Sequence, residues 1–321
     1  MRLFMLNQCP TPQPQLQQLN NKQQFTINTY SPDFGVYIGP IINSDSHKNN
    51  NNFIGHVFAI NESAIQLVNF TFDGNIPDTF FWLDRSQVPS RDGIRLSTFE
   101  YGLSPLGTLD PNSPVILILP EYELEDEQQE ELIERIEQLR IGQFKSLSLF
   151  SLNGDVPIGS VKIPENLIVP KTQLIQDELR GTRYDVQSGP IQILDTKTIK
   201  IFGFIFQGDK APDGYFYVGR GLNITKESGN NPINERYTGG KDIYVELPDG
   251  YDVQHIDWIS VYCLRFEVDY GHVFIRNISP MIPPHVQIPK GADDIFKTTN
   301  NLLGMLVTFL GLILNLTSPF N

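Results

Sequence analysis

The chain has 321 residues, enough for two domains of ordinary size, and 40% of them are hydrophobic, as in globular proteins. Its net charge of −13 and pI near 4.8 argue against nucleic acid as a partner, because few basic side chains are available to neutralise phosphates. Two cysteines cannot form a disulfide framework, and the sequence has no nucleophile elbow, phosphate loop, HExxH or CxxC motif.

The N-terminal end is rich in Gln, Asn and Pro, which predicts a disordered leader over residues 1–34. After Arg2 only four apolar residues follow in a row. A secretory signal needs a run of roughly 7–15 apolar residues, so no signal peptide is evident.

An internal repeat organises most of the remaining chain. Four blocks recur in the same order in the two halves, and the last of them aligns without a gap: 65–74 with 199–208, 77–83 with 212–218, 115–120 with 243–248, and 144–163 with 256–275. Four blocks in one order indicate a tandem duplication.

Each copy alternates short runs of β-branched and aromatic residues with Gly, Pro, Asn and Asp turns, which is typical of all-β proteins. The sequence therefore predicts two tandem antiparallel domains, each a β-sandwich or a small barrel, over residues 35–165 and 184–279 with a linker at 166–183. Asp73-Gly74 is expected to be part of a hairpin connection.

The first copy carries an insert at 121–140 that the second copy lacks. Leu132, Ile136 and Leu139 lie at helical spacing among acidic residues, which predicts one amphipathic helix. A solvated surface helix and a helix that binds a partner both fit this pattern.

The second copy contains the segment Asp257-Trp-Ile-Ser-Val-Tyr-Cys263, which has no Gly or Pro and is expected to form a strand. Alternation places Trp258 and Tyr262 on one face and Val261 and Cys263 on the other. Because both faces are largely apolar, we expect this strand inside the fold and not at an edge.

Cys263 is the candidate reactive group, with Trp258 and Asp257 beside it. It aligns with Ser151 in the first copy, and a buried serine hydroxyl would need a hydrogen-bond partner. A buried thiol that only packs, a redox thiol and a thiolate ligand to haem iron are all open interpretations. His255 and His272 are the nearest histidines, and either could lower the pKa of the thiol or supply a second ligand to haem iron.

Two further features bear on location. The N-glycosylation sequons at Asn61 and Asn223 would be used only in a secreted chain. After a Pro-containing stalk at 280–301, residues 302–316 are uncharged and almost wholly apolar, which favours a lipid-anchor signal or a short transmembrane tail over a terminal core helix.

Residues 69–82, and the stretch from Leu247 through the Asp257–Cys263 motif, resemble the DM thirteen domain, the electron-transfer module of Skeletor-type proteins. The resemblance covers about residues 37–165 and 170–277. It implies that Cys263 is the signature cysteine of the family, acting as a bare thiol or as a haem ligand. Ser151 at the matching position leaves at most one redox site.

In that family the domain is often tandem and lies beside a haem- or sugar-binding β-sandwich called DOMON. No DOMON-like segment is present in this sequence, so the resemblance implies an extracellular or membrane protein, such as a DOMON-containing redox protein, as partner. The resulting expectation is a membrane-anchored, cell-surface accessory protein for electron transfer. The alternative is a non-catalytic extracellular adhesion or matrix-binding protein, in which both domains only present surface.

Overall fold

The computed structural model describes residues 25–43, 55–98, 100–119, 139–211, 214–226, 229–233, 241–247 and 249–286. Regular structure in these residues consists of β-strands and two single-turn 3₁₀ helices, so the all-β prediction is confirmed. No helix in the described ranges is both long and apolar enough to cross a membrane. The predicted hydrophobic tail and nearly all of the predicted helix at 121–140 lie outside the described residues.

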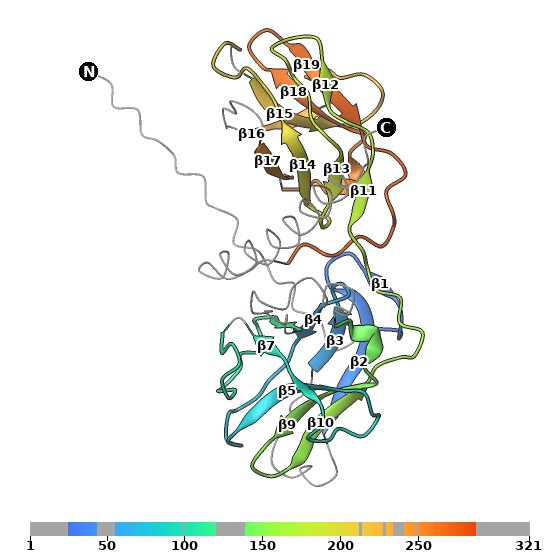
Figure 1. The fold of residues 1–321 in the computed structure, drawn as a ribbon, viewed down its shortest axis with the longest axis vertical. Helices are drawn as coiled ribbons and strands as arrows, with labels where there is room; N and C mark the ends of the chain where they lie inside the picture. The colour runs from blue at the N-terminus through green and yellow to red at the C-terminus, as the bar shows by residue number, and fades with distance from the viewer. Residues whose placement is uncertain are drawn as a thin grey trace, which may run out of the picture.

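The first domain is a single antiparallel sheet (Figure 1). Its strands are β1 (Tyr30–Ser31), β2 (Gly35–Asn43), β3 (Gly55–Ala59), β4 (Ala64–Val68), β5 (Thr79–Asp84), β6 (Ile94–Arg95), β7 (Ser97–Thr98), β8 (Val115–Ile118), β9 (Ser146–Ser151) and β10 (Val156–Lys162), with the 3₁₀ helix η3 at Ile141–Gln143. The order is β6-β5-β9-β10-β2-β3-β4-β8-β7, and β1 pairs with β2. Only Leu96 separates the two end strands β6 and β7, so the sheet is nearly closed into a barrel.

The second domain is a sandwich of two sheets. Its strands are β11 (Gln173–Ile175), β12 (Arg180–Gly181), β13 (Ile191–Ile193), β14 (Thr198–Phe204), β15 (Gly214–Gly219), β16 (Gly229–Ile233), β17 (Lys241–Glu246), β18 (Trp258–Cys263) and β19 (Val268–Phe274), with the 3₁₀ helix η4 at Val253–His255. One sheet has the order β11-β13-β14-β17 and the other has the order β12-β19-β18-β15-β16.

The two domains share one topology, which agrees with the predicted duplication. The pairings β5-β9-β10 and β3-β4-β8 of the first domain recur as β15-β18-β19 and β13-β14-β17 in the second. In the first domain, the single strand β2 pairs with both β3 and β10. In the second domain two separate strands make the equivalent pairings: β11 pairs with β13, and β12 pairs with β19. The barrel and the sandwich are therefore two forms of the same fold.

The hairpin expected at Asp73-Gly74 is wrong. β4 pairs with β3 and β8, whereas β5 pairs with β6 and β9, so the turn lies in a crossover between two parts of the sheet. The Asp73 carboxylate accepts from Asn75 N, and its carbonyl accepts from Thr108 Oγ1. These contacts cap a turn in the crossover and do not close a two-residue hairpin.

The ordered domains extend beyond the boundaries expected from composition. Phe25 and Phe34, within the expected leader, pack with Tyr37, His56 and Phe58 in a cluster of rings on the first domain. The expected linker contains β11 and β12 of the second domain. Aromatic and aliphatic residues in these polar-looking segments bury enough surface to order them.

Each domain has its own apolar core, so each is expected to unfold with its own stability. The first core contains a close backbone contact at Gly35, the first residue of β2. Its φ is +97°, and a Cβ there would lie 2.1 Å from the carbonyl oxygen of Ala59. Only glycine fits this position.

Replacing Gly35 with alanine is expected to lower the free energy of unfolding of the first domain by about 2–4 kcal/mol, because backbone strain and steric overlap act together. Urea unfolding followed by the fluorescence of Trp82, in a Trp258→Phe background, measures this. Gly142→Ala is the matched control, since a Cβ at Gly142 meets nothing within 4 Å. Equal midpoints for the two variants would contradict the assignment.

Candidate functional site

The candidate site lies on β18, a central strand of its sheet. β18 pairs with β15 on one side and with β19 on the other, and all six of its residues are buried, which confirms the expected internal position. Val261 and Cys263 face the main core, whereas Trp258 and Tyr262 pack with Tyr217 on the outer face. The strand therefore separates two different environments.

Cys263 ends β18 in the main core with 0% of its surface exposed. Tyr270 lies in the same core, where its hydroxyl interacts with the Cys263 side chain, and we call these two residues the thiol–phenol pair. Burial raises the pKa of Tyr270 well above its usual range, and the hydrogen bond to Cys263 raises it further. The phenol is therefore protonated at any physiological pH.

A β-bulge brings the phenol to the thiol. Val261 pairs with Gly271 and Tyr262 pairs with Asp269, so Tyr270 is an extra residue in β19 with no partner in the register. Simple alternation would not place Tyr270 beside Cys263, but the bulge turns its ring into the core. Period-two alternation therefore does not predict the position of Tyr270.

Other rings complete the surroundings of the thiol. The ring of Tyr184, which is partly buried, meets the ring of Tyr270 edge-on at a centroid distance of 4.8 Å, and the ring of Phe206 lies 6.2 Å from that of Tyr270. Gly214 pairs with Cys263, and a Cβ at Gly214 would lie 2.8 Å from the Phe206 ring and 3.4 Å from the Tyr270 ring. Glycine at this position leaves room for both rings next to the strand position that pairs with Cys263.

The residues around Cys263 do not fit haem ligation. A haem iron needs open access to the sulfur on one side, whereas Cys263 is wholly buried in the packed core of the second domain. Within the part of the chain that the structure describes, no group of three or more His, Cys, Asp or Glu residues could hold a metal ion.

The structure does not bring the predicted histidines to the thiol. His272 pairs with Ser260 on the outer face of the sheet, where its Nδ1 lies 2.6 Å from the carboxylate of Asp269. That carboxylate also accepts from Ser260 Oγ at 2.7 Å. His255 lies in η4, before the start of β18, and its Nδ1 contacts Asp252 at 2.6 Å. Roughly 17 Å of strand separates that end from Cys263.

The other two predicted residues have roles on the surface and on the outer face. Asp257 accepts a hydrogen bond from Gly221 N at 2.6 Å and so holds the start of the loop after β15. Trp258 is wholly buried among Tyr217 and Tyr262, and its Nε1 is without a hydrogen-bond partner in the described structure. Trp258 lies on the face opposite to Cys263, and Asp257 precedes β18 at the end of the strand away from Cys263.

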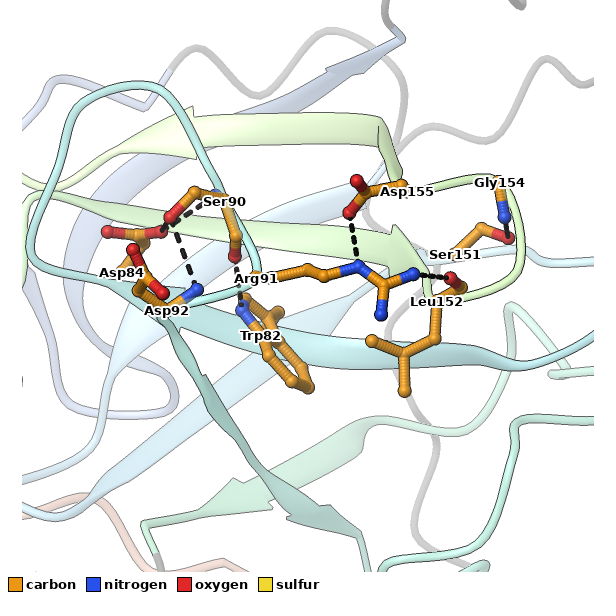
Figure 2. Close-up of polar contacts among 9 residues, drawn as sticks. All are labelled: Trp82, Asp84, Ser90, Arg91, Asp92, Ser151, Leu152, Gly154 and Asp155. Atoms are coloured by element: carbon orange, nitrogen blue, oxygen red, sulfur yellow. Dashed lines mark hydrogen bonds and ion pairs between the residues drawn. The ribbon is translucent and has the colours of Figure 1, made fainter.

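The first domain shows what the same framework does without the thiol (Figure 2). Ser151 has the register of Cys263, since it pairs with Thr79 and Val156 as Cys263 pairs with Gly214 and Val268. Its hydroxyl lies 3.3 Å from Gly154 N and 3.4 Å from the Pro77 carbonyl oxygen. Serine is therefore tolerated at this buried position because its hydroxyl has partners.

The phenol is also missing from the first domain. Ile158 is the extra residue of the same bulge in β10 and is fully buried in the first core. The first domain thus lacks both residues of the pair: Ser151 stands at the position of Cys263, and Ile158 at the position of Tyr270. This joint change was visible in the gap-free alignment of the two copies and could have identified Tyr270.

The outer face of the first domain is closed by the loop between β5 and β6. Figure 2 shows Trp82 Nε1 donating to the Ser90 carbonyl at 2.9 Å, and the Asp84 carboxylate accepting from both Ser90 N and Ser90 Oγ. Arg91 continues the loop with an ion pair to Asp155 at 2.7 Å. The indole N–H is satisfied here, unlike that of the second domain.

Comparison with known proteins identifies the family. The family model described as "Electron transfer DM13" matches residues 42–163 and 178–275, one match in each domain. Protein Skeletor of Drosophila melanogaster is 31% identical over 239 residues, both as isoforms B/C and as isoforms D/E. The match covers 71% of this chain but only 28% and 15% of those two proteins. No solved structure matches. The chain therefore belongs to the DM13 electron-transfer family, with two copies of the domain.

Proposed function

We propose that this protein is an accessory module for electron transfer in which the thiol–phenol pair of the second domain is the redox group. The observation that carries the proposal is the burial of Cys263 and Tyr270 together in the second core, with the partly buried ring of Tyr184 against the ring of Tyr270. The description of the family supports the same class of function.

The burial of Cys263 limits which redox reactions its thiol can undergo. Thiol–disulfide exchange requires direct attack by an accessible thiolate, and Cys263 is 0% exposed. Electrons, unlike leaving groups, can cross a packed core without access of a reagent to the sulfur. The contacting rings of Tyr270 and Tyr184 supply a route from the sulfur toward the surface.

In the proposed step the thiol–phenol pair loses one electron and one proton. The electron passes by way of the Tyr270 and Tyr184 rings to a one-electron acceptor at the surface, which is reduced, and the proton goes to water. The pair becomes a neutral radical in which Sγ of Cys263 and the phenolic oxygen of Tyr270 share one hydrogen. An electron from a one-electron donor and a proton from water restore it.

The acceptor is proposed to be an extracellular or membrane protein that carries a one-electron centre, such as a DOMON-containing redox protein. A cell-surface location, with membrane attachment through residues 302–316, remains part of the proposal. Asn223 is exposed and suits glycosylation, whereas the carboxamide oxygen of Asn61 accepts from Ser63 N at 2.8 Å. The first domain, with Ser151 and Ile158, is proposed to have a structural or matrix-binding role.

The thiol of Cys263 is expected to react with Ellman's reagent only when the second domain opens, at a rate about a thousandfold or more below that of the unfolded chain. The reaction is timed in a Cys9→Ser background with and without urea. Native-state labelling at the rate of the unfolded chain would contradict the packing around the sulfur.

One-electron oxidation by hexachloroiridate is expected to produce a radical in the Cys9→Ser protein that freeze-quench electron paramagnetic resonance detects. Cys263→Ser and Tyr270→Phe should each remove this signal, and the double variant should lose no more, because the two residues act as one unit. Tyr184→Phe should slow radical formation about tenfold or more.

Ser151→Cys is the matched control, because it places a thiol at the equivalent buried position beside Ile158 and not beside a tyrosine. Added to Cys263→Ser, it should not restore the radical. Urea midpoints of all variants separate loss of the pair from loss of the fold. An unchanged radical in both Cys263→Ser and Tyr270→Phe would overturn the proposed function.

A further inference from the structure

The segment that follows β19 returns to the second domain. Ile282 is 0% exposed in the second core, and the Pro283 carbonyl accepts from Thr196 N at 2.9 Å. Gln173 and Gln254 hold the start of the segment by hydrogen bonds to the backbone of Ser279. The prolines of this stretch predict a stalk from residue 280, but residues 280–286 are packed against the folded protein.

His285 fastens the end of the segment to the turn between β13 and β14. Its backbone N donates to Thr196 Oγ1 at 3.0 Å, and its Nδ1 lies 3.3 Å from the Asp195 carboxylate. On the other side of the ring, Nε2 lies 3.8 Å from the carboxylate of Glu246, in β17. Two carboxylates, one from this turn and one from β17, therefore face one imidazole.

The same segment contacts the first domain at two points. Tyr30 Oη, in β1, donates to the Ile282 carbonyl at 2.7 Å. Val286 packs against an apolar cluster of the first domain, which consists of Ile60, Ala64, Ile116 and Ile118. One short segment thus bonds to the second domain through His285 and covers apolar surface of the first domain through the next residue.

We infer that residues 279–286 form a clasp that holds the two domains together and that protonation of His285 tightens it. The charged imidazole attracts Asp195 and Glu246 and fixes the backbone that positions Val286. When His285 loses its proton, this attraction disappears and the contact between Val286 and the first domain becomes weaker. The clasp therefore makes the distribution of distances between the two domains depend on pH.

The charges around His285 support this direction. The hydrogen bond to Asp195 raises the pKa of His285 above its usual value, and the charges of Asp195 and Glu246 add to it, against burial and Lys197. Because the folded-state pKa is raised, the stabilisation is complete below the unfolded pKa of about 6.5 and is lost as pH rises through the folded-state pKa. The side chains that meet Val286 on the first domain are apolar and do not titrate.

Tyr30 is the other titratable contact of the clasp, and its hydrogen bond does not change over the pH range in which a histidine titrates. Burial, followed by the charges of Asp252 and Asp33, raises the pKa of Tyr30 to about 12, so its hydroxyl donates throughout. Burial lowers the pKa of His56 in the first domain, and its protonation would affect the stability of that domain. A distance between the domains is therefore a better readout than stability.

The test uses the full chain in a Cys9→Ser background with spin labels at Val88→Cys and Leu222→Cys, which are 72% and 77% exposed. Double electron–electron resonance then gives the distribution of distances between the two domains. We expect a narrow distribution near pH 5.5 and a broader one near pH 8.5, about one unit below and two units above the usual histidine pKa.

His285→Gln should abolish the pH dependence, whereas His272→Gln, which removes a histidine–carboxylate pair outside the clasp, should keep it. Val286→Asp should broaden the distribution at both pH values, because a carboxylate cannot pack on the apolar cluster. A narrow distribution in Val286→Asp would overturn the clasp. A pH-independent distribution in the parent protein, or an unchanged pH dependence in His285→Gln, would overturn the role of His285.

Discussion

The interaction between Cys263 and Tyr270 is the one on which the proposed redox role of the second domain depends. It exists because three features coincide at the end of one central strand. A bulge in β19 turns Tyr270 inward, Gly214 leaves room for its ring, and Tyr184 continues the row of rings toward the surface. An unpaired hydroxyl in the core costs about 1–3 kcal/mol, so the interaction of the Tyr270 hydroxyl with Cys263 adds to the stability of the domain.

The two domains share one fold but differ at the two residues that the proposed function requires. Both keep the central strand, the bulge and an aromatic outer face, so these features belong to the fold. Only the second has the thiol and the phenol, whereas the first has Ser151, with its own hydroxyl partners, and Ile158. In the first domain, polar groups close the outer face. The indole N–H of Trp82 donates a hydrogen bond to the loop between β5 and β6, which covers this face. The clasp then joins the two domains through a third segment.

Much of the fold could be predicted from the sequence, and the limits have physical reasons. The internal position of β18 followed from period-two alternation, and the duplication followed from the order of four blocks. His272 was a candidate partner of the thiol, but it pairs with Ser260 and so lies on the outer face of the sheet, whereas Cys263 faces the core. Tyr270 was missed because a bulge breaks alternation, and a bulge depends on the register with the neighbouring strand. The hairpin at Asp73-Gly74 failed because turn residues mark a reversal of direction but do not specify which strands pair.

The infrared band of the S–H stretch tests the central interaction most directly. With Cys9 replaced by serine, Cys263 is the only thiol in the chain, so one band reports on it alone. If the thiol is hydrogen-bonded to the phenol in a packed core, the band is narrow, and Tyr270→Phe shifts its frequency while the domain stays folded. A band with the same frequency in the parent protein and in Tyr270→Phe would show that the thiol–phenol pair does not exist.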